Sequence, residues 1–67
     1  MKVFGERLKE LRNEKGLSIL QLGNELGVSD ATICRWENDK SDVKAEQIVL
    51  VAQYFKVTTD YLLGLED

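Results

Sequence analysis

Few residues in this chain have side chains that could carry out chemistry. The sequence has no histidine and a single cysteine, Cys34, so it holds no ligand set for a zinc site. Glu25 and Asp30 are candidates for a pair of acid–base carboxylates, but no nucleophile or third group accompanies them. Cys34 has neither His nor Lys beside it to activate the thiol, which favours a small surface residue over a redox switch. The sequence therefore predicts no enzyme, no metal and no cofactor.

The remaining polar side chains of interest gather on residues 29–38. Ser29 is a strong N-cap candidate for a helix that runs to about Glu37. Ile33 and Trp36 lie three residues apart and define the buried side of this helix. The opposite face then carries a carboxylate, a guanidinium, an amide and two small side chains. These exposed candidates are Asp30, Ala31, Cys34, Arg35 and Asn38.

Two helices must come before this segment to position it. The first is predicted over residues 3–15, from apolar residues that repeat with the period of a helix, and ends at Gly16. The second opens at Ser18. Gln21 follows three residues later, and this spacing predicts a capping box in which each side chain bonds the other residue's backbone N–H. Gly27 ends the second helix after little more than two turns.

Two further helices are predicted after it. The fourth runs from about Val43 to Phe55 and is capped by Ser41 or Asp42, and the short fifth helix is capped by Thr58 and stops at Gly64. The sequence shows no strand pattern and no internal repeat. It therefore predicts an all-α fold, a compact bundle of five helices in a single domain over residues 1–67.

The second and third helices have the features of a helix-turn-helix, a motif that binds DNA. Gly23 supplies the small residue needed where the two helices cross, and Gly27 supplies a turn residue that tolerates positive φ. Val28, Ile33 and Trp36 can anchor the third helix from beneath. The motif spans residues 19–38, and its exposed helix covers about residues 29–37.

Composition limits the class of protein but does not choose the partner. The lone cysteine fits a reducing compartment, and no apolar run is long enough to span a bilayer, so we expect a cytoplasmic location and no membrane contact. The formal net charge is −3, whereas DNA-binding domains usually present a basic face. The charge is therefore the main argument against DNA as the partner, although a local field can differ from the net charge.

The strings ERLKELRNEKGLS, LGNELGVSDATICRWEN and VAQYFKVTTDYLLG resemble the Cro/cI-type helix-turn-helix family, the XRE-like class of phage repressors. The resemblance covers about residues 4–64 and implies a lambda-repressor-like bundle. It also implies that the third helix is a recognition helix in the major groove of double-stranded DNA. Arg12 and Glu37 are expected to form an ion pair between the first and third helices.

Given the recognition helix that the resemblance implies, side-chain chemistry suggests two sets of DNA contacts. Arg35 suits guanine O6 and N7, Asp30 can accept from cytosine N4, and Ala31 can touch a thymine methyl. The base-contacting candidates are thus Asp30, Ala31, Cys34, Arg35 and Asn38. The phosphate-contacting candidates are Ser18, Ser29, Thr32, Lys40 and Lys44.

The implied function is that of a sequence-specific transcriptional regulator, a repressor that binds a two-fold operator as a homodimer. Thr59, Tyr61 and Leu62 are the candidates for the dimer interface. Two departures from the family weaken DNA binding: Ile19 stands where Gln is frequent, and Asp30 places a carboxylate in the groove. The alternative is a helix-turn-helix that binds a protein, as an antitoxin or as an antagonist of another regulator. No small-molecule ligand is evident.

Overall fold

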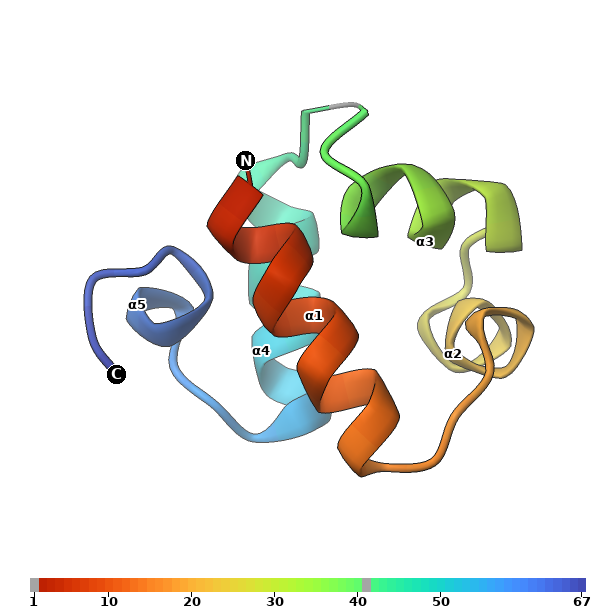
Figure 1. Ribbon diagram of the computed structural model, residues 1–67, viewed down its shortest axis with the longest axis horizontal. Coiled ribbons are helices and arrows are strands. Elements are labelled where there is room, and N and C mark those ends of the chain that lie inside the picture. Colours follow the sequence, from red (N-terminus) through yellow and green to blue (C-terminus); the bar gives the residue numbers. More distant parts are fainter. Residues whose placement is uncertain (1, 41) are drawn as a thin grey trace.

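The computed structural model describes residues 2–40 and 42–67, and the regular secondary structure over these ranges is helical (Figure 1). They are α1 (Lys2–Glu14), α2 (Ile19–Leu26), α3 (Asp30–Glu37), α4 (Ala45–Phe55) and α5 (Thr59–Leu62). None of them has the length and apolar character needed to cross a membrane. The all-α class and the order of the five predicted helices are confirmed.

The core lies between α1 and the other helices. Helix α1 packs against α3 on one side and α5 on the other, whereas α4 contacts α2 and α5 and passes behind α1 in Figure 1. Every helix contributes apolar side chains to this core, which forms the main source of stability. The buried apolar residues are Phe4, Leu8, Leu22, Leu26, Ile33, Trp36, Ile48, Val51, Ala52 and Leu62.

Three of the predicted helix starts carry the expected side-chain caps. Ser18 forms both bonds of its capping box with Gln21, and the hydroxyls of Ser29 and Thr58 each accept a hydrogen bond from the first turn of α3 and α5. These caps satisfy backbone N–H groups that have no partner inside their helix.

The predicted start of α4 is wrong. The helix begins at Ala45 instead of Val43, and its N-cap is Lys44, so Asp42 does not cap it. Ser41, the other predicted cap, lies outside the described residues. The amide oxygen of Gln47 accepts from the backbone N–H of Lys44 at 3.0 Å, but among the described residues no side chain accepts a hydrogen bond from the first turn of α4.

Gly5 allows α1 to lie directly against the end of α3. A Cβ added at Gly5 would clash with the carbonyl oxygen of Trp36 and lie 2.9 Å from that of Glu37. Both neighbours are backbone atoms of a helix end, so they cannot turn aside as a flexible side chain can. The distance between α1 and α3 therefore depends on the absence of a side chain at this position.

We predict that Gly5→Ala destabilises the domain by about 1–3 kcal/mol, because the added methyl overpacks the α1–α3 contact and outweighs the better helix propensity of alanine. Urea unfolding measures this change. Glu10→Ala, at an exposed position of the same helix, is the control and should shift the free energy of unfolding by no more than about 0.5 kcal/mol. A Gly5→Ala variant as stable as the control would contradict the close-packed α1–α3 contact.

Candidate nucleic-acid interface

The turn between α2 and α3 is built around two glycines. A Cβ at Gly23 would lie 2.8 Å from the carbonyl oxygen of Val28, so the backbone after α2 passes closer to the helix than a methyl group allows. Gly27 adopts φ 73°, the left-handed conformation that glycine adopts without steric cost, and its N–H bonds the carbonyl oxygen of Gly23. Together the two glycines set the close approach of α2 and α3.

Helix α3 is anchored from one side and exposed on the other. Ile33 is fully buried, and Trp36 is 2% exposed and makes an edge-to-face contact with Phe4 at a centroid distance of 6.1 Å. These anchors fix the rotation of α3 about its axis. As the helical spacing predicted, the five base-contacting candidates are exposed on the other side; they are Asp30, Ala31, Cys34, Arg35 and Asn38.

On the exposed face of α3, the side chains of Asp30 and Asn38 bond backbone groups of the helix, whereas that of Arg35 can reach outward. The Oδ1 of Asp30 accepts from the backbone N–H of Ala31 at 2.9 Å, and a carboxylate at this end of a helix is favoured by the helix dipole. The Nδ2 of Asn38 donates to the carbonyl oxygen of Cys34 at 2.8 Å. Over the described residues, the Arg35 side chain makes no hydrogen bond or ion pair, so its guanidinium can meet a partner directly.

Four of the five phosphate-contacting candidates form two groups at opposite ends of α3, and the fifth, Ser18, is the N-cap of α2 and follows the Leu17 carbonyl group that Arg12 links to Glu37. Ser29 and Thr32 lie at the start of α3, where their hydroxyls bond each other at 2.8 Å. Lys40 and Lys44 are exposed in the segment that follows α3, and Figure 1 places this segment beyond the C-terminal end of α3, away from α2. The two groups could therefore contact a long, charged ligand on both sides of α3.

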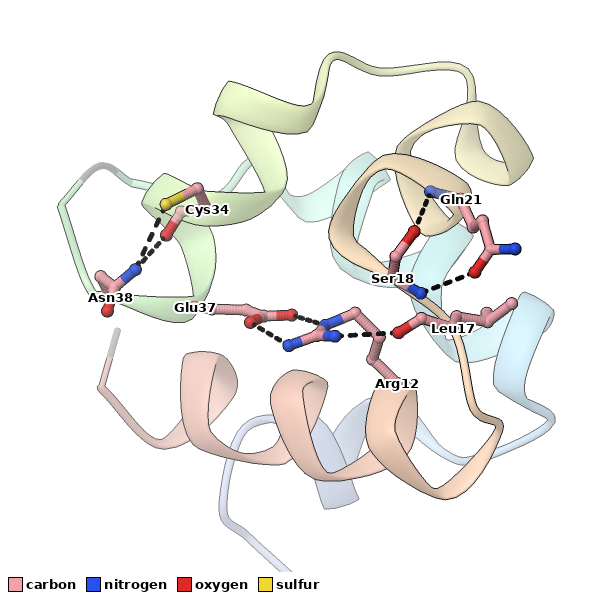
Figure 2. A network of polar contacts seen from close by, with 7 residues as sticks. All are labelled: Arg12, Leu17, Ser18, Gln21, Cys34, Glu37 and Asn38. Carbon is pink, nitrogen blue, oxygen red and sulfur yellow. Dashed lines mark hydrogen bonds and ion pairs between the residues drawn. The ribbon is translucent and has the colours of Figure 1, made fainter.

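Beneath this surface, Arg12 joins α1 to α3 (Figure 2). Its Nε lies 2.6 Å from Oε2 of Glu37, its Nη2 donates to Oε1 of Glu37 at 3.1 Å, and its Nη1 donates to the carbonyl oxygen of Leu17 at 2.9 Å. The hydrogen bonds to Glu37 raise the pKa of Arg12 above its ordinary value. The structure thus contains the ion pair that the family resemblance implied, together with a contact to Leu17 that it did not.

The C-terminal candidates need a correction. Leu62 is fully buried in the core, so it cannot contribute to an interface with another chain. Thr59 and Tyr61 are half-buried, and Thr59 lines an apolar groove between α4 and α5 with a volume of about 200 Å³. The other residues of the groove are Ala45, Ile48, Val49 and Leu63.

Sequence reasoning missed two aromatic contacts that hold the outer helices. The guanidinium of Arg7 stacks over Tyr61 at 4.3 Å and donates to the carbonyl oxygens of Tyr61 and Glu66. Lys15 lies 4.3 Å from the ring centroid of Tyr54, whose hydroxyl donates to Glu25 at 3.2 Å. These cation–π and hydrogen-bond contacts join residues far apart in the sequence, and residue spacing carries no signal for them.

We predict that Arg12→Ala or Glu37→Ala destabilises the domain by about 3–5 kcal/mol, because either change leaves the other charge buried without its partner. Urea unfolding followed by circular dichroism measures the loss. Arg35→Ala, which removes an exposed arginine with no partner among the described residues, is the matched control and should unfold like the parent chain. Equal stability of the Arg12→Ala and Arg35→Ala variants would contradict this account of the ion pair.

Comparison with known proteins identifies the family. A helix-turn-helix family model matches residues 8–62. The HTH-type transcriptional activator BcrR of Enterococcus faecalis is 38% identical over 64 residues, covering 96% of this chain and 31% of BcrR. The HTH-type transcriptional repressor RghR of Bacillus subtilis is 41% identical over 64 residues, covering 94% of this chain and 47% of RghR. The chain therefore spans less than half the length of these two curated relatives.

A solved structure extends the match to the arrangement of the helices. The c2 repressor of phage P22, crystallised in complex with a synthetic operator, superimposes with a TM-score of 0.82 at 26% sequence identity, covering 92% of this chain and 94% of that chain. The family model, the relatives and this likeness agree with the geometry of α2 and α3. The chain belongs to the helix-turn-helix family and is of the Cro/cI type.

Proposed function

We propose that the chain is a sequence-specific double-stranded DNA-binding regulator of transcription, with α3 in the major groove. The observation that carries the proposal is the division of α3 into a buried side and an exposed side. Ile33 and Trp36 fix the buried side, and the exposed side carries the guanidinium of Arg35, which has no partner among the described residues. A helix held in this way can present side chains to base edges at a fixed angle. The likeness to a repressor crystallised with an operator supports the same function.

The proposed contacts follow from side-chain chemistry. Arg35 binds O6 and N7 of a guanine with its two parallel N–H groups, and Ala31 contacts a thymine methyl. Asp30 keeps one carboxylate oxygen beyond its bond to Ala31, which can accept from cytosine N4. Asn38 and Cys34 face the same major groove of the DNA. Ser18, Ser29, Thr32, Lys40 and Lys44 contact phosphates on the two flanks.

The regulator acts in the cytoplasm as a repressor, by covering an operator that polymerase would otherwise use. A two-fold operator requires a homodimer, and the groove between α4 and α5 supports one. Thr59 lines this groove, and Val49 at its edge is 44% exposed, so its apolar side chain is accessible to a second copy of the chain. Tyr61 lies on the same helix as Thr59 and extends the proposed interface.

A second candidate function is binding to a protein, as an antitoxin or an antagonist of another regulator. The net charge of −3 opposes attraction to a polyanion, and Leu20 on α2 is 58% exposed. A protein partner could cover Leu20, whereas DNA would gain little from it. This candidate predicts no enrichment of any duplex by the chain.

We predict that the chain enriches specific duplexes from a random pool and that Arg35→Ala weakens specific binding by about 1–3 kcal/mol, with loss of preference at one guanine. Fluorescence titration at two salt concentrations measures both effects. Lys9→Ala, at an exposed position of α1, is the control and should bind like the parent chain. Absence of binding at low salt would favour the protein partner, and unchanged discrimination by Arg35→Ala would overturn its assignment.

For the dimer, we predict that Val49→Asp turns a dimer into a monomer that keeps its helical circular dichroism spectrum, because it places a charge in the apolar groove but not in the core. Sedimentation equilibrium, with and without DNA, measures the oligomeric state. Gln53→Asp, exposed on the same helix outside the groove, is the matched control and should stay dimeric. A parent chain that remains monomeric on DNA at high concentration would rule out the proposed interface.

A further inference from the structure

The polar network around Arg12 continues past the ion pair into the start of α2 (Figure 2). Nη1 of Arg12 donates to the carbonyl oxygen of Leu17, and the N–H of the same peptide, on Ser18, donates to Oε1 of Gln21 at 2.8 Å. The hydrogen bonds therefore run from the Glu37 carboxylate through the guanidinium and one peptide group to the Gln21 amide. Bonds joined in this way polarise and strengthen one another.

Arg12 holds Leu17 at two points. The backbone carbonyl oxygen of Arg12 accepts from the N–H of Leu17 at 3.1 Å, while its side chain donates to the carbonyl oxygen of Leu17 at 2.9 Å. Both groups of the residue that precedes the N-cap of α2 are thus fixed by a single residue of α1. The other end of the same guanidinium is fixed by Glu37, the last residue of α3.

We propose that Arg12 is a positioning residue for DNA binding, which holds the phosphate-facing start of α2 at Ser18 in register with the base-facing side of α3. This inference rests on the proposed function. A helix in the groove and a phosphate contact at Ser18 must both fit one rigid duplex, so their separation has to be set by the protein. The link through Arg12 sets it, because one planar guanidinium bonds both elements at once.

The positioning role can be separated from the contribution of the ion pair to stability. Replacing both partners of a buried ion pair with apolar residues of similar size is frequently neutral for stability. The double variant Arg12→Met with Glu37→Leu therefore keeps the packing between α1 and α3 but loses the donor to Leu17. Arg12→Lys is a second route, since it keeps a cation beside Glu37 and loses the planar fork.

The first measurement uses the free chain and does not depend on DNA. In either variant, the amide hydrogens of Ser18 and Gln21 should exchange with solvent at least about tenfold faster, while those of Ile33 and Val51 keep their protection. Val51→Ala, a core change, is the control for a general loss of stability and should speed exchange at the amides of Ile33 and residue 51 more than at those of Ser18 and Gln21. A uniform change in the Arg12 variants would overturn the inference, whether or not the chain binds DNA.

The second measurement uses a duplex enriched by the parent chain. Ser18→Ala should weaken binding in the parent chain but have little further effect in the double variant, a departure from additivity of about tenfold in affinity. Arg35→Ala should cost the same in both backgrounds, because α3 itself stays in place. Equal cost of Ser18→Ala in both backgrounds would overturn the inference while leaving the proposed function standing.

Discussion

The guanidinium of Arg12 can be buried only where acceptors surround it, and this requirement joins α1, α3 and the segment before α2 at one point. Removing a cation from water is costly unless its N–H groups are bonded, and the planar fork dictates where the acceptors must lie. Glu37 supplies two of them and Leu17 the third. Every buried side-chain nitrogen and oxygen of the described residues has a partner. The desolvation cost of this cation therefore acts against any arrangement that separates the three elements.

Two glycines, Gly5 and Gly23, determine how closely the helices can approach their neighbours. The bond from Arg12 to Glu37 limits how far α1 and α3 can separate. Gly5 lets the two helices approach closely, because its missing side chain leaves room for the carbonyl oxygens of Trp36 and Glu37. Gly23 does the same between α2 and the turn that follows it. The bonds of Arg12 therefore hold the helices together, and the backbone contacts at Gly5 and Gly23 set their closest approach. This leaves little freedom for α3 to turn about its own axis.

Local rules predicted most of this fold from the sequence. The caps at Ser18, Ser29 and Thr58 depend on residues within one turn of the helix, so their spacing was sufficient. The prediction for the start of α4 was wrong because the helix begins after Lys44, a residue whose side chain does not cap it, and not after Asp42. The burial of Leu62, the close contact at Gly5 and the stacking of Arg7 on Tyr61 depend on how distant helices pack, and no spacing in the sequence reports that.

The candidate site has few cations and a fixed geometry, and the first property makes binding depend on the second. A protein that neutralises many phosphates binds DNA strongly whatever the DNA sequence. Such binding tolerates small displacements of the protein, because the electrostatic attraction is long-ranged. This chain has a net charge of −3, and Asp30 sits at the start of its exposed helix. Its proposed contacts through Arg35 and Ser18 are short hydrogen bonds, which weaken steeply when distance or angle changes. Discrimination between sequences through such bonds requires that α2 and α3 be held rigidly, and the positioning role proposed for Arg12 would meet this requirement through its bonds to Leu17 and Glu37.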